Sequence, residues 1–278
     1  MNQFGGNWTE QKIEIVVAYA KAYLTVMNKY PQFNTLYFDG FAGSGSIIKE
    51  RDNEIEIIKG AALRILEIDK PKSFDRYYFV EKEMKYKIEL EKAIEQDFPN
   101  KTFNVVCEDC NTKIIAMAKF LKENKSYRVL AFVDPYGMAV NWSSIETLKG
   151  LGIDLWILVP TGIGVNRLLK KNGDISESWL KKLQNFLGVT KEEILEVFYK
   201  KFKQMHLFDS GVTLIKEEDA IHRIHKLYEQ RLKTIFKMVS EPFILRNSSN
   251  SIMFHFMMAT NNGAALNIAN DVVKKYKL

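Results

Sequence analysis

The residue group with the clearest chemical potential in this sequence is Asp134-Pro135-Tyr136-Gly137, which follows an apolar run at 129–133. The Asp134 carboxylate and the Pro135 carbonyl can accept hydrogen bonds from an exocyclic amine, while the Tyr136 ring stacks on the attached base. Directing the lone pair of that amine at an electrophilic methyl group is mostly a matter of positioning. The simpler interpretation is a Pro-Tyr-Gly turn without a ligand. We predict that these four residues form a catalytic group.

A glycine-rich turn, Asp39-Gly40-Phe41-Ala42-Gly43-Ser44-Gly45, follows another apolar run at 36–38. Its glycines let the backbone approach a ligand closely. The turn lacks the G-x-G-x-x-G spacing of dinucleotide sites and the Gly-Lys-Ser/Thr of a phosphate loop. An acidic residue before the glycines instead suits a cationic amine, such as S-adenosylmethionine with its ammonium and sulfonium. The alternative is a strand-to-helix turn that needs glycine for geometry alone. The predicted cofactor contacts here are Asp39, Gly40, Phe41, Ala42, Gly43 and Gly45.

Two further carboxylates follow the next two apolar runs along the chain. Glu81 ends the run at 77–80, where a carboxylate can accept both hydroxyls of a ribose. It could equally be a solvated member of the charged run at 81–83. Asp109 follows the run at 103–107, where it could accept a hydrogen bond from an adenine amino group. We predict that Glu81 and Asp109 complete the cofactor site.

Cysteine is scarce, with Cys107 and Cys110 the only two in the chain. One C-x-x-C pair cannot make a structural zinc site without further ligands, and the four histidines form no ligand pattern with it. We therefore expect no metal and no redox role. Two cysteines also do not form a disulfide framework, which favours a reducing compartment. With no apolar run of 18 residues and no signal-peptide core, the sequence predicts a cytoplasmic protein without membrane contact.

Apolar strands and helical patterns alternate through the first 160 residues. A helix over 8–27 comes first, with Lys12 facing away from its apolar side. Strands are then expected at 36–39, 77–81, 103–107, 129–133 and 155–159, with helices at 59–69, 84–96, 111–123 and 143–149 between them. Near-continuous apolar strands separated by helices indicate a parallel sheet covered on both faces. The sequence predicts an α/β fold, a doubly wound Rossmann-like sheet.

The alternation stops after Pro160. Helices are expected over 166–203 and 216–239, and strands at 243–246 and 252–260. Five polar residues join these two strands, a connection short enough to require an antiparallel hairpin. A helix over 264–276 ends the pattern. We predict a Rossmann-like core with the first helix over 1–160, a basic helical insertion over 161–215, and a C-terminal completion of the core over 216–278.

The basic charge is concentrated in one part of the chain. The net charge is +6, and residues 165–238 hold 15 Lys and Arg against 10 Asp and Glu, so most of the excess lies there. Lysine pairs in this segment recur near Trp179, Phe186, Phe198 and Tyr199. Basic residues interleaved with aromatic ones suit phosphate contact and base stacking. The alternative is a helical bundle with the aromatic residues in its core and the lysines in water.

The ordered set of Asp39 to Gly45, Glu81, Asp109 and Asp134 to Gly137 resembles the motifs of class I S-adenosylmethionine-dependent methyltransferases. Asp134 to Gly137 resembles the D/N-P-P-Y/F signature of amino methyltransferases acting on nucleic acid bases, but lacks one proline and has a glycine after the aromatic residue. The D-P-F-G motif of tRNA guanine-N2 methyltransferases is a closer match. The resemblance implies S-adenosylmethionine as cofactor and an exocyclic amine of an RNA or DNA base as acceptor.

Over nearly its full length the chain resembles the three-Cys-motif partner proteins, a bacterial family of methyltransferase-like fold. The matching segments are residues 8–12, 37–45, 132–137 and 256–262. This resemblance implies a three-Cys-motif protein as a partner and leaves the substrate open. Two hypotheses follow: a methyltransferase acting on an exocyclic amine of a nucleic acid base, or a partner subunit that kept the fold and lost methyl transfer.

Overall fold

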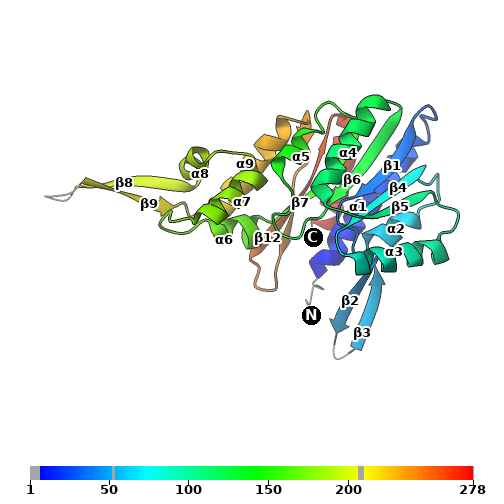
Figure 1. Ribbon diagram of the computed structural model, residues 1–278, viewed down its shortest axis with the longest axis horizontal. Helices are drawn as coiled ribbons and strands as arrows, with labels where there is room; N and C mark the ends of the chain where they lie inside the picture. The colour runs from blue at the N-terminus through cyan, green and yellow to red at the C-terminus, as the bar shows by residue number, and fades with distance from the viewer. Residues whose placement is uncertain (1–6, 52–53, 206–209, 278) are drawn as a thin grey trace.

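The computed structural model describes residues 7–51, 54–205 and 210–277, in which the main feature is an eight-stranded sheet (Figure 1). Five of its strands are parallel and lie in the order β5-β4-β1-β6-β7. They are β1 (Asn34–Asp39), β4 (Arg76–Glu81), β5 (Phe103–Cys107), β6 (Tyr127–Val133) and β7 (Ile153–Val159). The chain first adds β4 and β5 on one side of β1 and then β6 and β7 on the other side. The direction in which strands are added therefore reverses between β1 and β6. Ligands of open α/β sheets bind at such a switch point, beyond the carboxyl ends of the strands.

The far edge of the sheet is antiparallel. The long strand β12 (Ile252–Thr260) runs antiparallel to β7, and β10 (Met238–Val239) and β11 (Phe243–Arg246) pair with β12. The hairpin expected at 243–260 is therefore confirmed. Asn262 then caps the last helix, α10 (Gly263–Tyr276), by accepting hydrogen bonds from the backbone N–H groups of Ala264 and Ala265.

Helices cover both faces of the sheet, as predicted, because alternate strand residues enter opposite cores. Tyr37 points into one core and Phe38 into the other. The first core is closed by α1 (Asn7–Met27), α2 (Ala61–Leu66), α3 (Met84–Asp97) and α10, and α1 packs against α10. The second is closed by α4 (Cys110–Glu123), α5 (Trp142–Glu146), α7 (Glu177–Leu187), α8 (Lys191–Phe198) and α9 (Ala220–Lys233). No helix in the described part of the chain is both long and apolar enough to cross a membrane.

The segment after β7 is helical, but its end differs from the prediction. It begins with η1 (Thr161–Val165) and α6 (Asn166–Leu168), followed by α7 and α8. The expected helix to residue 203 ends at Phe198, where the strand β8 (Tyr199–Met205) begins and pairs with β9 (Ser210–Lys216). The expected helix over 216–239 is α9, which is shorter at both ends. The lysine-rich stretch suits either structure locally, and the β-branched residues of β9 provide the pairing partner.

A second hairpin follows the glycine-rich turn. Its strands, β2 (Ser46–Arg51) and β3 (Glu54–Lys59), pair with each other and not with the main sheet. The helix expected over 59–69 is correspondingly reduced to α2. Both hairpins project from the body of the molecule, β8–β9 in one direction and β2–β3 in another (Figure 1).

Candidate functional site

The three strands at the centre of the sheet bring three carboxylates to one edge. Asp39 ends β1, Glu81 ends the neighbouring β4, and Asp134 follows β6 on the other side of β1. The charges of Asp134 and Glu81 both contribute to raising the pKa of the Asp39 carboxyl. The structure thus gathers the predicted carboxylates of β1, β4 and β6 at the switch point.

Glu81 holds the glycine-rich turn in place. Its Oε2 accepts a hydrogen bond from the Gly43 N–H at 2.9 Å, and its Oε1 accepts one from the Glu83 N–H at 2.8 Å. Each carboxylate oxygen has a second lone pair, so Glu81 keeps the capacity to accept ribose hydroxyls. These two hydrogen bonds are not those of a glutamate that only contacts solvent.

The glycines of the turn differ in what they are needed for. A Cβ on Gly40 would lie 2.6 Å from the Cys110 Sγ, and one on Gly45 would lie 2.8 Å from a Leu90 methyl, so both are packing requirements. Gly43 has a positive φ of 63°, yet no atom lies within 4 Å of where its Cβ would be. Gly43 therefore faces open space, from which a molecule could approach the backbone of the turn.

Asp39 is buried beneath this turn, with 1% of its surface exposed. Its Oδ1 accepts a hydrogen bond from the Phe41 N–H at 3.0 Å, and its Oδ2 accepts one from the Tyr37 hydroxyl at 3.4 Å. Burial, with the nearby Asp134 and Glu81 charges, raises the pKa of the Asp39 carboxyl to about 7. In this structure Asp39 supports the turn from below and reaches a ligand only through its charge.

Asp134 has a partner that sequence reasoning placed elsewhere. The Lys12 ammonium, from the first turns of α1, bonds to the Asp134 Oδ2, and the two side chains are only 9% and 20% exposed. The expectation that Lys12 faces away from the apolar side of its helix is wrong. Lys12 precedes the buried Val16 and Ala20 at four-residue steps, and this spacing places it on the buried face.

The rest of the predicted catalytic group lies around this ion pair. Pro135 is buried, and Gly137 has a positive φ of 65° that turns the loop. Tyr136 is 72% exposed, the most exposed of the large apolar side chains in the described residues. A ring so exposed next to a half-buried carboxylate can offer one face to a flat ligand.

Asp109 and Cys110 lie at the start of α4, whereas Cys107 ends β5. Asp109 is exposed and caps the helix, since its Oδ1 accepts a hydrogen bond from the Asn111 N–H at 2.8 Å. Cys110 is buried under Gly40, and burial raises the pKa of its thiol. Within 7–51, 54–205 and 210–277, no group of three or more His, Cys, Asp or Glu side chains is placed to hold a metal ion.

Asn111 is a structural link that the sequence analysis missed. Its side-chain amide donates to the Ala139 carbonyl at 2.9 Å, and its Oδ1 accepts from the Asn141 N–H at 2.7 Å and from the Ser144 hydroxyl at 3.0 Å. These bonds fasten the loop that carries Asp134 to the turn that carries Asp109. No sequence pattern signals such a long-range amide contact.

Proteins similar to this chain are found by comparing structures and not by comparing sequences. No family model matches the sequence, and no curated protein matches it. Among solved structures, protein LPL1258 from Legionella pneumophila, assigned to the family model DUF519, superposes with a TM-score of 0.54 at 11% identity, over 98% of this chain and 94% of that one.

Two other solved structures match less well. Trm1 from Pyrococcus horikoshii with S-adenosyl-L-methionine matches with a TM-score of 0.41 at 10% identity, over 91% of this chain and 64% of that one. An S-adenosylmethionine-dependent methyltransferase from Clostridium acetobutylicum matches with a TM-score of 0.36 at 8% identity, over 88% and 92%. None of the three is described as a three-Cys-motif partner protein, so that resemblance stays a prediction. The chain has the Rossmann-like α/β fold, similar along nearly its whole length to that of LPL1258.

Proposed function

We propose that this protein binds S-adenosylmethionine at the switch point and transfers its methyl group to an exocyclic amine of a nucleic acid base. The observation that carries the proposal is Asp134: its carboxylate lies beside the glycine-rich turn, half-buried, ion-paired to Lys12, and followed by the exposed Tyr136. Bound cofactor would supply an electrophilic methyl group and leave as the neutral thioether. The residues of this chain would position the amine, and the Asp134 carboxylate could accept the proton that the methylated nitrogen releases.

The residues around the glycine-rich turn fit such a cofactor. Gly43 faces open space on the ligand side, and Glu81 lies directly behind it with free lone pairs for ribose hydroxyls. The carboxylate of Asp109 is exposed at the next strand end, where it can accept from an adenine amino group while it caps α4. The buried Asp39 contributes negative charge beneath a ligand that carries an ammonium and a sulfonium.

The acceptor side is formed by the loop after β6. Lys12 bonds to Oδ2 of Asp134, which leaves Oδ1 to accept one amine hydrogen, and the Pro135 carbonyl can accept the other. With both hydrogens held, the amine lone pair points away from these acceptors. Tyr136 provides a ring on which the base can stack, and a stacked base is fixed in the plane that this geometry needs.

The same ion pair favours a second candidate, a methyltransferase-like partner subunit without transfer. The Lys12 ammonium already bonds to the carboxylate that would accept the amine. If this carboxylate cannot hold Lys12 and a base amine at the same time, only cofactor binding remains.

Two measurements separate these possibilities. Isothermal titration with S-adenosylmethionine tests cofactor binding, and no binding by the folded protein would rule out the enzyme. Incubation with radiolabelled cofactor and total cellular RNA or DNA tests transfer. We expect Asp134→Ala to abolish transfer with nearly unchanged cofactor affinity, whereas Asp271→Ala, at an exposed position on α10, should change neither. Cofactor binding with no transfer to either nucleic acid would favour the partner subunit.

A further inference from the structure

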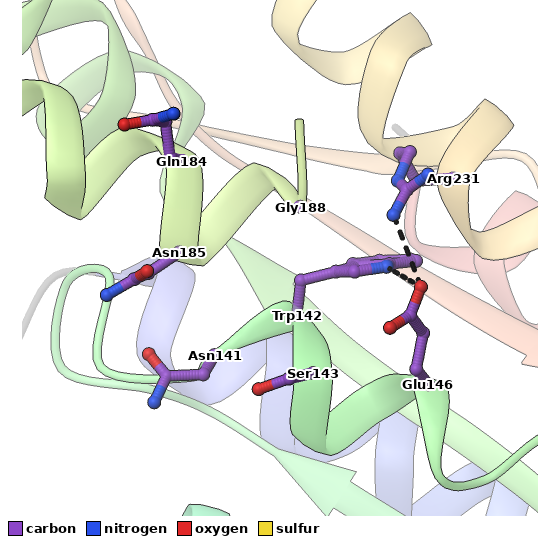
Figure 2. Close-up of a pocket in the computed structure, with 8 residues that line it drawn as sticks. All are labelled: Asn141, Trp142, Ser143, Glu146, Gln184, Asn185, Gly188 and Arg231. Atoms are coloured by element: carbon purple, nitrogen blue, oxygen red, sulfur yellow. Dashed lines mark hydrogen bonds and ion pairs between the residues drawn. The ribbon is translucent and has the colours of Figure 1, made fainter. Parts of the chain in front are cut away.

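A hollow lies where α5 meets α7 and α9 (Figure 2). It has a volume of about 300 Å³, at the small end of the range for ligand pockets and enough for one aromatic base. Its rim contains four uncharged hydrogen-bonding side chains, namely those of Asn141, Ser143, Gln184 and Asn185. Asn141 and Asn185 face each other across it in Figure 2.

The floor of this hollow is rigid. Trp142 is 3% exposed and packs directly on Gly188, where an added Cβ would lie 2.1 Å from the indole ring. The Arg231 guanidinium lies 4.7 Å from the centre of the same indole. Glu146 joins the two, because its Oε1 accepts from the Trp142 Nε1–H at 3.0 Å and pairs with the Arg231 guanidinium at 3.4 Å (Figure 2). The one cation and the one anion neutralise each other, so the hollow itself selects an uncharged group.

The rim side chains have unused hydrogen-bonding capacity. Within the described part of the chain, no hydrogen bond is made by the side-chain amides of Asn141, Gln184 and Asn185 or by the Ser143 hydroxyl. Each amide has a donor and an acceptor side by side, which matches the alternating donors and acceptors on the edge of a nucleobase. A purely apolar or charged ligand would leave these groups unused.

Positive charge lies next to the hollow. Lys181 is four residues before Asn185 on α7 and therefore on the same face of that helix. Lys182 follows Lys181 in the sequence. Both lysines are exposed, and neither forms an ion pair with any described residue. Amides that suit a base edge and free lysines that suit phosphates together indicate a nucleic acid strand.

The hollow and the candidate catalytic group belong to one loop. Asn141 is five residues after Tyr136, which a fully extended chain could separate by at most about 18 Å. Asn111 fastens the Asn141 backbone in place. A strand whose target base stacks on Tyr136 would therefore pass the hollow within a few nucleotides.

We propose that this hollow binds one base of a single-stranded nucleic acid, next to the base presented at Tyr136, through the amides of Asn141, Gln184 and Asn185. The proposal rests on the proposed function, since it assumes a nucleic acid acceptor. It adds a subsite that reads the sequence flanking the target.

The test uses the full-length protein and fluorescein-labelled 12-nucleotide strands of one mixed sequence, made as RNA and as DNA. Fluorescence anisotropy gives the dissociation constant of each. We expect Gln184→Ala/Asn185→Ala to weaken binding about tenfold. Gln96→Ala/Asn100→Ala, a matched pair of exposed amides on and just after α3, should bind like the wild type. If the RNA and DNA strands have different dissociation constants, the tighter complex identifies which nucleic acid the hollow binds.

A set of strands with one abasic site at each position in turn adds a second readout. The wild type should lose affinity when the base for the hollow is missing, and the Gln184→Ala/Asn185→Ala protein should be insensitive at that position. Equal binding by this variant and the wild type, or an unchanged abasic profile, overturns the subsite. Wild type that binds neither strand overturns it too. Cofactor titration and the Asp134→Ala transfer assay are independent of both results, so the proposed function can stand when the subsite fails.

Discussion

Lys12 and Asp134 are 122 residues apart in sequence and form an ion pair at the carboxyl edge of the sheet. The pair ties the start of α1 to the loop that carries the candidate catalytic group. Both side chains are mostly buried, so each charge offsets part of the cost of burying the other.

Replacing Lys12 by methionine keeps the length of the side chain and removes its charge. We expect a loss of about 2–4 kcal/mol in the free energy of unfolding, because the Asp134 carboxylate is left half-buried without its cation. Methyl transfer should fall at least tenfold, while S-adenosylmethionine affinity should change little. Urea denaturation, the transfer assay and calorimetry measure the three. Lys85→Met removes an exposed pair with Glu89 and should change stability very little. Unchanged transfer in the Lys12 variant would show that the pair is structural only.

Asp39→Asn should stabilise the protein increasingly as pH rises. The pKa of Asp39 is about 7 in the fold and 3.8 as its ordinary value, so the folded protein holds a proton that the unfolded chain releases between these values. The wild type therefore loses the Asp39 contribution as pH rises from about 4 to about 7. Asparagine has no charge to bury and can still accept from the Phe41 N–H. The variant should gain roughly 2–4 kcal/mol at pH 8 and little at pH 4. Chemical denaturation across this range, with exposed Asp271→Asn as control, measures the gain; a gain independent of pH would contradict it.

Two stacked histidines act in the opposite direction. The His225 and His255 rings lie 4.5 Å apart and nearly parallel, and burial lowers their pKa values to about 4 and about 3. The unfolded chain takes up protons near pH 6.5 that the fold excludes, so these residues reduce stability as pH falls from 6.5 to about 4. Among the described residues the His225 Nε2 has no hydrogen-bond partner, so His225→Phe should keep the stacking and make the acid loss shallower.

The comparison is made on differences between variant and wild type, because Asp39 contributes an opposite slope over the same range. Exposed Gln230→Ala, on the same helix as His225, should leave the acid profile as it is. An equally steep loss in His225→Phe would show that these histidines do not set it.

Gly43→Ala and Gly150→Ala form a matched pair. Both glycines have positive φ, 63° and 76°, and neither has an atom within 4 Å of an added Cβ. Each substitution should cost about 1 kcal/mol through backbone strain alone. Only Gly43 faces the proposed cofactor, so only Gly43→Ala should weaken S-adenosylmethionine binding, by tenfold or more. Denaturation and calorimetry on both variants check this. Equal cofactor affinities would place the cofactor away from the turn.

The sequence predicts the central sheet well because a strand that is buried on both faces is apolar at nearly every position. The five parallel strands are near-continuous apolar runs, and each carboxylate or aromatic group of interest follows one of them. The carboxyl ends of parallel strands share one edge, so the meeting of Asp39, Glu81 and Asp134 follows from the fold alone.

The two projecting hairpins were not predicted, for a physical reason. Their strands pair only with each other, and isoleucines alternate irregularly with charges in 46–59 while lysines dominate 199–205. Neither stretch shows a clear two-residue period in its sequence. The role of Lys12 was missed because a lysine at the start of a helix usually faces water, although its four-residue spacing from Val16 and Ala20 places it on the buried face.

The packing of α1 against α10 has a consequence for synthesis of the chain. The helix that provides Lys12 is made well before the helix it packs on, which spans Gly263–Tyr276. Lys12 therefore gains its full support only after residue 276 has left the ribosome. A truncated chain that lacks α10 would contain every candidate catalytic residue and still be without a fixed counter-ion for Asp134.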